Sequence, residues 1–442
     1  MSPTATSTPT WSPLLEGEDR ERALAAVTAV AEAIGDAPLA GAASGPTLAT
    51  GEAGVALLFD ALERAGFGAG YGEIAVLRIE RAMELLAASP LEPGLFSGFT
   101  GVGWVAEVLQ RGLADDGAAE AGDLEDDEQD LNVSVDEALA HHLAKTPWTY
   151  HFDLTTGLAG YGVYALERLP HPAAVAALEW IVEHLAEIAA PRPGGLCWHT
   201  PYEMQPEPNR KWFPKGLDNL GVAHGTPGVI ALLARIVAAG VAVERAGGLL
   251  RSAVAWLLAQ KLPLGERSIF PYSVGEEVKI RPTRAAWCFG DPGIAAALLA
   301  AGRAAGEPEW EREGLAAARA VAVRQAERCG VNDACLCHGA AGLGHVLNRL
   351  YQATGDPDLR EGARAWLRRA LDFRQPGRGI GGFLALIPLD GDFENLDWQE
   401  DPSFLNGSTG MALTLLAAIS EEEPAWDRAL LLSPLAGRTS TA

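Results

Sequence analysis

A Gly-x-x-Gly pattern recurs seven times along the chain, and a run of apolar residues follows each copy. Consecutive copies lie 47 to 68 residues apart. A unit that recurs at such spacing is typical of repeat architectures, in which each unit buries its apolar face against its neighbours. The pattern therefore predicts one repetitive domain instead of the two or three that 442 residues would suggest. The first glycines of the seven copies are Gly51, Gly98, Gly157, Gly225, Gly290, Gly339 and Gly407.

The segments within each repeat predict two kinds of helix. The runs after the glycines, such as Ile294-Ala-Ala-Ala-Leu-Leu299, are apolar on all sides, as is typical of a buried helix. The segments between copies, such as residues 173–189 and 316–328, carry one charged face. We therefore expect an all-α fold in which each repeat pairs an inner helix with an amphipathic outer helix. Seven pairs could stack as an open solenoid or close into a ring, and the ring is favoured because neither end resembles a polar cap.

The glycines would then surround one mouth of the ring. Glycine at these turns would permit a positive φ and would let neighbouring backbones approach closely.

We expect a single domain over residues 21–435, preceded by a tail and interrupted by three segments that depart from the repeat. Residues 1–20 are rich in Ser, Thr and Pro and are expected to form a disordered tail. Residues 115–130 hold nine acidic residues and no basic one, which predicts a solvated loop insertion. Residues 191–216 are rich in aromatic and turn residues and predict a short hairpin or lid over the mouth. Residues 265–274 resemble them.

Charge and cysteine content exclude several classes of protein. The net charge of −24 leaves no basic surface for nucleic acid or for an anionic membrane. The five cysteines are odd in number and lie mostly in the C-terminal half, so they do not indicate a disulfide framework. We find neither a signal peptide nor an apolar run long enough to span a membrane. We therefore expect a cytoplasmic protein.

Metal-ligand residue types precede two consecutive Gly-x-x-Gly copies. Cys288 lies two residues before Gly290, and Cys337 and His338 lie directly before Gly339. Equivalent positions in neighbouring repeats should face the same mouth, and two thiolates with one imidazole suit zinc. Three protein ligands leave a fourth position open, which is typical of a catalytic zinc. Cys335 is a competing ligand, but it is out of register with Cys288.

Three further residues could act beside such a metal. His224 lies directly before Gly225, in the register of His338, and we interpret it as an acid or base. Asp153 lies four residues before Gly157 and could orient His224. Arg284 lies four residues before Cys288. For Asp153 and Arg284 a surface or structural role is an equally good interpretation.

Taken together, these motifs resemble the lanthionine synthetase C-like family, the cyclases of lantibiotic biosynthesis. The resemblance covers roughly residues 51–418 and implies an α/α toroid of seven inner and seven outer helices. It implies one Zn²⁺ per chain bound by Cys288, Cys337 and His338, with His224, Asp153 and Arg284 as the residues around it. The matching stretches are Ala223-His-Gly-Thr-Pro-Gly228, Trp287-Cys-Phe-Gly-Asp-Pro-Gly293, Cys337-His-Gly-Ala-Ala-Gly342 and Phe404-Leu-Asn-Gly-Ser-Thr-Gly410.

The resemblance also implies a reaction and partners. Family members add cysteine thiols of a precursor peptide to dehydroalanine or dehydrobutyrine, which forms lanthionine or methyllanthionine. The expected substrate is a dehydrated leader-plus-core peptide, and a separate dehydratase and a transporter are the expected companions, through which the chain could associate with a membrane. Two other hypotheses remain. One is a cyclase-like protein that adds glutathione or another small thiol to electrophilic sites. The other is a non-catalytic helical scaffold that binds a partner protein, with zinc as a structural clip and, for instance, Cys335 as a fourth ligand.

Overall fold

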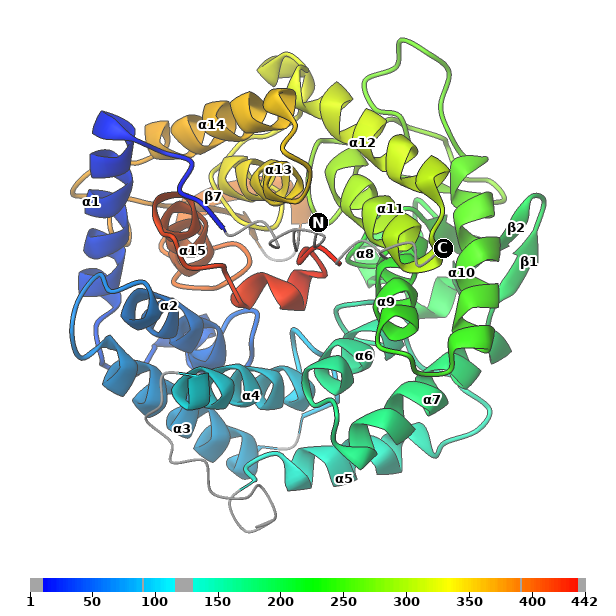
Figure 1. The fold of residues 1–442 in the computed structure, drawn as a ribbon, viewed down its shortest axis with the longest axis horizontal. Helices are drawn as coiled ribbons and strands as arrows, with labels where there is room; N and C mark the ends of the chain where they lie inside the picture. Colours follow the sequence, from blue (N-terminus) through cyan, green and yellow to red (C-terminus); the bar gives the residue numbers. More distant parts are fainter. Residues whose placement is uncertain (1–10, 90, 116–129, 390–391, 436–442) are drawn as a thin grey trace, which may run out of the picture.

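The structure is a computed structural model that describes residues 11–89, 91–115, 130–389 and 392–435. Within these residues two concentric rings of helices form an α/α toroid (Figure 1). The seven inner helices are α2 (Glu52–Arg64), α4 (Phe99–Asp115), α6 (Leu158–Glu167), α9 (Thr226–Ala238), α11 (Asp291–Ala305), α13 (Ala340–Thr354) and α15 (Ser408–Ile419). The seven outer helices are α1 (Gly17–Ile34), α3 (Tyr71–Ala88), α5 (Val133–Leu143), α7 (Pro172–Glu187), α10 (Val243–Leu258), α12 (Pro308–Ala322) and α14 (Pro357–Asp372).

The inner ring is closed, as the sequence predicted. Each inner helix packs against the next, and α15 returns to pack against α2. The outer partner of α15 is α1, so the first helix of the chain completes the last repeat. The N-terminal segment strengthens this closure, because the indole N–H of Trp11 donates to the carbonyl of Ala417 at 2.9 Å.

Burial follows the amphipathic pattern of the two helix classes. Every residue of α15 is buried, whereas the outer helix α14 buries only the stripe that contains Leu359, Ala363, Trp366 and Leu367. Inner helices are surrounded by both neighbours and by their outer partner, so apolar side chains on all faces leave water. Outer helices keep a charged face in solvent.

The loops before the inner helices form a continuous circlet of main-chain hydrogen bonds. In six repeats the residue two positions before the first glycine donates its N–H to the corresponding loop of the next repeat, and in the third repeat Leu154, three positions before Gly157, does so, all at 2.9 to 3.4 Å. These bonds place equivalent positions of adjacent repeats side by side. The linked residues are Ala49 to Phe96, Phe96 to Thr155, Leu154 to Ala223, Ala223 to Cys288, Cys288 to Cys337, Cys337 to Leu405 and Leu405 to Ala49.

Close approach, and not positive φ, explains most of the repeated glycines. Among the first glycines whose φ is recorded, only Gly290 has a positive value, at 125°, whereas Gly339 and Gly407 lie at −96° and −99°. A Cβ on the second glycine would overlap the carbonyl oxygen of the residue six positions earlier, as for Gly342 and Leu336. The expectation of positive φ is therefore wrong for most copies, and the expectation of close backbone approach is confirmed.

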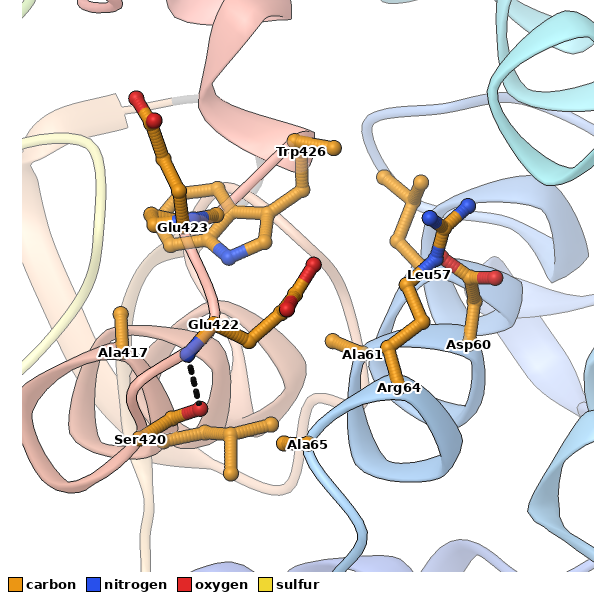
Figure 2. Close-up of a pocket in the computed structure, with 13 residues that line it drawn as sticks. Leu57, Asp60, Ala61, Arg64, Ala65, Ala417, Ser420, Glu422, Glu423 and Trp426 are labelled. Carbon is orange, nitrogen blue, oxygen red and sulfur yellow. Dashed lines mark hydrogen bonds and ion pairs between the residues drawn. The ribbon is translucent and has the colours of Figure 1, made fainter. Parts of the chain in front are cut away.

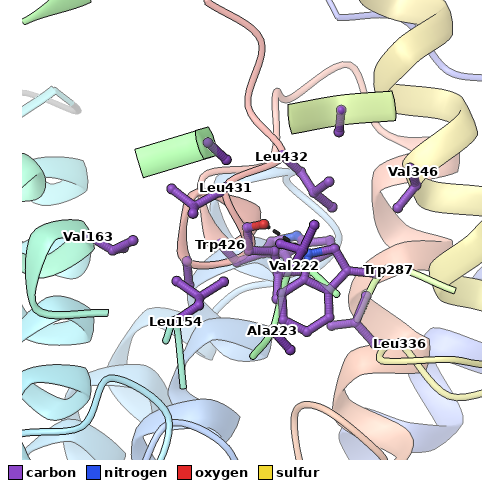
Figure 3. Close-up of a cluster of buried hydrophobic side chains, with 14 of the residues drawn as sticks. Leu154, Val163, Val222, Ala223, Trp287, Leu336, Val346, Trp426, Leu431 and Leu432 are labelled. Carbon is purple, nitrogen blue, oxygen red and sulfur yellow. Dashed lines mark hydrogen bonds between the residues drawn. The ribbon is translucent and has the colours of Figure 1, made fainter. Parts of the chain in front are cut away.

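The C-terminal segment fills the centre of the inner ring. Its short 3-10 helix η4 (Trp426–Leu430) appears in red at the middle of Figure 1. Trp426, Leu431 and Leu432 lie among apolar side chains from the loops, including Leu154 and Leu336 (Figure 3). The Trp287 indole donates to the carbonyl of Leu430 at 2.9 Å. The toroid therefore has a packed centre beneath the circlet.

A buried charge cluster holds this C-terminal segment to α13. Asp427 accepts hydrogen bonds from His345 Nε2 at 2.7 Å and from Arg349 Nη2 at 2.8 Å. All three side chains are almost fully buried. Burial alone would raise the pKa of Asp427, but the Arg349 charge and the His345 hydrogen bond hold that pKa well below its usual range.

Three small β-sheets are formed by the loops between the helices in the described part of the chain. The hairpin of β1 (Ala190–Arg192) and β2 (Gly195–Cys197) packs against α10. A three-stranded sheet joins β3 (His199–Thr200), β4 (Leu217–Asn219) and β5 (Ser273–Val274), and a separate hairpin pairs β6 (Ala385–Leu389) with β7 (Asp392–Gln399). The remaining short elements are η1 (Gly41–Ala43), η2 (Tyr202–Met204), α8 (Glu207–Arg210) and η3 (Ala326–Arg328).

The insertions differ in part from the expectations. Residues 11–20 belong to the folded toroid, because Leu14 and Leu15 are buried and α1 begins at Gly17, so the predicted tail is wrong there. Residues 1–10, and residues 116–129 of the acidic insertion, lie outside the described residues. The predicted lid at residues 191–216 begins as the β1–β2 hairpin on α10. It ends near the mouth, where Phe213 stacks on Tyr272.

No helix in the described parts of the chain is both long and apolar enough to span a membrane.

Candidate functional site

The structure brings Cys288, Cys337 and His338 together at the circlet. Their potential ligand atoms all lie within 4.8 Å of one another. The Cys288 N–H donates to the carbonyl of Cys337 at 3.4 Å, because the two residues are neighbouring members of the circlet. The repeat thus places the two thiols side by side at one mouth of the toroid, and His338 follows directly in the chain.

The electrostatics of this group favour a cation. A hydrogen bond from the Cys337 thiol, with help from the adjacent His338, holds the pKa of Cys288 well below its usual range despite burial. Burial opposes a charge on His338, but the sulfurs of Cys335 and Cys288 outweigh it and raise the His338 pKa to about 11. Sulfurs that attract a proton to the imidazole would also attract a metal cation. Two thiols and one imidazole are the donors that zinc prefers, so the residues fit zinc.

Cys335 belongs to a second group that shares His338. Asp333, Cys335 and His338 also have ligand atoms within 4.8 Å of one another. Cys335 is fully buried, and its sulfur accepts the backbone N–H of His338 at 3.4 Å. Among the described residues, no single group of this size joins Cys335 to both Cys288 and Cys337. A tetrahedral metal ion on the three-residue group would therefore keep one position without a Cys, His, Asp or Glu donor from the described part of the chain.

Asp333 lies near the His338 ring, just beyond hydrogen-bond distance. Its Oδ2 is 3.9 Å from His338 Nε2, and the carboxylate is almost fully buried. A carboxylate behind a metal-binding histidine commonly fixes the orientation of the ring.

His224 and Asp153 form a hydrogen-bonded pair at the same mouth. His224 Nδ1 donates to Asp153 Oδ2 at 2.7 Å, and the histidine side chain remains 47% exposed. Asp153 also accepts the backbone N–H of Thr156 at 2.8 Å. Burial alone would raise the pKa of Asp153, but the His224 and Thr156 hydrogen bonds lower it. Asp153 therefore stays ionised and holds the His224 ring by Nδ1, which leaves Nε2 available.

The pair lies beside the three-residue group. Ala223, directly before His224, donates its N–H to the carbonyl of Cys288 at 3.3 Å. The His224 ring lies 6.0 Å from the Phe289 ring, centre to centre. Partial burial lowers the pKa of His224, but the hydrogen bond to Asp153 and then the charges of Asp153 and Cys288 outweigh it and raise the pKa. The histidine is therefore predisposed to carry a proton next to the cysteines.

Arg284 is exposed at this mouth. Within the described residues its side chain makes no hydrogen bond or ion pair. The pKa of Cys288, lowered chiefly by the Cys337 thiol, is lowered further by the charge of Arg284. Its guanidinium thus acts on the site and remains available for another partner.

Sequence reasoning missed several contributors. Thr156 and Asp333 act through turn geometry that residue types alone do not reveal. Tyr272 stacks on Phe289 at 4.5 Å between ring centres, and it lies between Phe289 and Phe213. Burial and the Cys288 charge raise the pKa of Tyr272 to about 12. The aromatic content of the two insertions was the only available signal for this column of rings.

One further group of possible metal ligands and one small pocket are weaker candidates for a functional site. Asp130, Asp136 and His171 also have ligand atoms within 4.8 Å, but both carboxylates bond to Arg168, at 2.5 and 2.6 Å. A pocket of about 30 Å³ lies where the C-terminal ends of α2 and α15 meet, with Leu57, Ala61 and Trp426 in its wall (Figure 2). It lies at the C-terminal end of α2, whereas the cysteines lie just before the N-terminal ends of their inner helices. The pocket and the cysteines are therefore at opposite ends of the inner ring. Neither feature rivals the circlet as a catalytic centre.

A larger cavity, of about 650 Å³, also lies among the C-terminal ends of the inner helices. Four arginines line it, and each bonds to a carboxylate or a main-chain carbonyl of the protein. They are Arg64, Arg111, Arg235 and Arg428.

The chain is similar to known proteins over most of its length. The family model described as lanthionine synthetase C-like protein matches residues 43–431. Among solved structures, nisin cyclase superposes with a TM-score of 0.65 at 19% identity, covering 87% of this chain and 92% of that one. An inactive variant of the α-1,6-mannanase GH76A of Salegentibacter sp. HEL1_6, in complex with α-1,6-mannotriose, matches with a TM-score of 0.46 at 10% identity. That match covers 94% of this chain and 100% of the other.

The match to nisin cyclase supports the toroidal fold, and the family model spans most of the chain, including the circlet and both groups of site residues. The chain therefore belongs to the lanthionine synthetase C-like family.

Proposed function

We propose that this protein is a zinc-dependent cyclase of lanthipeptide biosynthesis. It would add cysteine thiols of a dehydrated precursor peptide to dehydroalanine or dehydrobutyrine and so form lanthionine or methyllanthionine rings. The observation that carries this proposal is the placement of the His224–Asp153 pair beside Cys288, Cys337 and His338. A purely structural metal clip would have no need of such a pair.

The reaction requires an activated thiol. A free cysteine thiol has a pKa of about 8.5 and is mostly protonated at neutral pH. Zinc bound by Cys288, Cys337 and His338 would supply a Lewis acid that favours the thiolate form of a substrate cysteine. The protein contributes three donors in a preformed arrangement at the mouth.

His224 is suited to move the proton. Addition forms a bond between sulfur and the β-carbon, and the α-carbon of the resulting enolate must then gain a proton. His224 Nε2 would deliver that proton, because Nδ1 is held by Asp153 and the pair raises the His224 pKa against the effect of burial. Asp153 would fix the ring orientation and stabilise the charged imidazole. The thiol proton replaces the one delivered, so the reaction is neutral overall.

Arg284 is suited to stabilise the enolate oxygen. Its guanidinium is exposed at the mouth and, among the described residues, is committed to no side-chain partner. A cation placed where negative charge develops lowers the barrier of the step.

The partners follow from this reaction. The substrate would be a dehydrated peptide with leader and core segments, delivered by a separate dehydratase, and a transporter would export the product. A cytoplasmic location, with contact to a membrane only through such a complex, fits this sequence of steps.

The test is single-turnover cyclisation of a synthetic peptide that contains one dehydroalanine and one cysteine. His224→Ala should retain the metal but slow ring closure by about 10²-fold or more, since general acid–base catalysis contributes this much. His141→Ala, an exposed histidine on α5, is the matched control and should react at the wild-type rate. A wild-type rate in His224→Ala would refute the assignment.

A second assay separates the cyclase from a small-thiol transferase. The peptide would carry dehydroalanine but no cysteine, and glutathione would be supplied in solution. A cyclase should favour the intramolecular reaction strongly, because holding both reactants in one chain raises the effective concentration of the thiol. Glutathione addition as fast as ring closure would favour the transferase instead.

A further inference from the structure

The β6–β7 hairpin is a two-stranded sheet with no third strand among the described residues. Leu386 pairs with Trp398, and Pro388 pairs with Leu396. No main-chain hydrogen bond in the described parts of the chain reaches the outer edges of these two strands. Unpaired N–H and C=O groups along a strand edge are a template for another strand.

The described side chains of β7 are more exposed than those of β6. Leu396 and Trp398 are each 43% exposed, whereas the β6 residues from Leu386 to Leu389 are half-buried. Because side chains alternate along a strand, Leu396 and Trp398 lie on the same face. Large apolar side chains held side by side in solvent are typical of a binding surface.

Charge on the hairpin favours a particular kind of partner. Asp397 points to the opposite face of β7, and Glu400 follows the strand. Both are exposed, and residues 395–401 contain no basic side chain. An extended segment that alternates apolar and basic residues would satisfy the apolar face, the Asp397 carboxylate on the opposite face and the open main chain together.

The hairpin is continuous with the candidate site. The chain runs from Gln399 at the end of β7 to Leu405, whose carbonyl accepts the N–H of Cys337 at 2.9 Å. Six residues of extended chain reach at most about 20 Å. A polypeptide on β7 could therefore reach the loops of Leu405 and Cys337 within about six further residues.

We infer that the outer edge of β7 receives an extended segment of the precursor peptide as a third strand, with its apolar side chains on Leu396 and Trp398. The inference rests on the proposed function, since it assigns the peptide substrate a second contact outside the reacting centre. Main-chain pairing gives affinity with little demand on sequence, and the exposed face selects alternating apolar and basic residues.

The experiment uses two synthetic probes and the zinc-loaded protein. Each fluorescent probe alternates Val and Lys over six residues and continues through a six-residue Gly/Ser linker, and it ends in Cys in one version and Ser in the other. Their Kd values are measured by anisotropy. Leu396→Ser/Trp398→Ser removes the apolar face. Trp180→Ser/Val243→Ser is the matched control, because those two side chains are each 48% exposed on the outer helices.

The hairpin variant should bind both probes about tenfold more weakly than the wild type, and the control variant should bind like the wild type. Amides of residues 395–399 should also gain protection from hydrogen exchange when the probe binds. Equal affinity of the hairpin variant and the wild type, an equal loss in the control, or no protection in β7 would each overturn the inference.

The two probes keep the two proposals apart. Replacement of Cys by Ser should weaken binding equally in the wild type and in the hairpin variant. If this replacement has no effect, capture of the thiol at the metal fails, while the hairpin inference is still decided by the variants and the exchange data.

Discussion

Gly342→Ala should loosen the candidate metal site without touching a ligand. Gly342 is the second glycine of the sixth repeat, at the start of α13. A Cβ at this position would fall on the carbonyl oxygen of Leu336, well inside the 3.0 Å that real Cβ atoms keep. Because Leu336 directly precedes Cys337, relief of this overlap must move the segment that carries two of the three proposed ligands.

The magnitude follows from the overlap. The loop or helix α13 must shift by roughly 1 Å, and overpacking of this kind costs about 1–3 kcal/mol of folding free energy. Metal-binding and catalytic side chains tolerate displacements of only about 0.5 Å from their productive positions. We therefore expect zinc affinity to fall by about 10- to 100-fold, the range seen when the support of metal ligands is disturbed.

Competition with a chromogenic chelator gives the zinc affinity, and thermal unfolding of the metal-free protein gives the stability. Gly101→Ala is the matched control, because its Cβ would meet the carbonyl of Leu95 in the same way, in a repeat without ligands. Both variants should lose similar stability, but only Gly342→Ala should lose zinc affinity. Wild-type stability of both variants, or equal zinc affinities, would refute this account of the repeated glycines.

Three further outcomes follow from buried carboxylates. Asp427→Ala should lower the free energy of unfolding by about 3 kcal/mol, measured by urea denaturation, because Arg349 is left charged and buried. Since the folded state depresses the Asp427 pKa, its stabilisation is present above the unfolded pKa of about 3.9 and is lost as pH falls toward the folded value. The difference in stability between the wild type and Asp427→Asn should therefore shrink steadily as the pH falls below about 4, and a constant difference would contradict the linkage. Asp333→Asn should weaken zinc binding about tenfold while metal-free stability stays at the wild-type value, and unchanged zinc affinity would remove Asp333 from the support of His338.

The helices of the repeat could be predicted because each one is specified by residues that are adjacent in the sequence. Each apolar run follows a Gly-x-x-Gly turn, and the structure begins every inner helix directly after the first glycine, as α15 begins at Ser408 after Gly407. Ring closure could be inferred from the absence of polar caps. The partner of the last inner helix could not, since α1 and α15 are nearly 400 residues apart and their contact is a property of the closed ring.

The sequence pattern also could not predict that the C-terminal segment fills the centre of the inner ring. Residues 426–432 carry no repeat signal, yet Trp426 and Leu430 lie at the core of the toroid. Their placement depends on long-range hydrogen bonds, such as that from Trp287 to the Leu430 carbonyl. Such bonds form only between completed elements.

At the candidate site, the position of each residue relative to the first glycine of its repeat predicted which side chains would meet. Cys288 and Cys337 hold equivalent positions in adjacent repeats, and the main-chain circlet makes them neighbours. His224 and Asp153 meet because their loops are adjacent members of the same circlet. Thr156 and Asp333 escaped prediction, because their contacts depend on the turn conformations and not on the spacing of the repeat.

Zinc per chain, measured in the purified wild type and in two cysteine variants, tests the central claim most directly. The account predicts about one zinc in the wild type, almost none in Cys337→Ala, and about one in Cys335→Ala, because Cys335 lies outside the group formed by Cys288, Cys337 and His338. A wild-type chain without zinc, or loss of zinc in Cys335→Ala together with retention in Cys337→Ala, would contradict it.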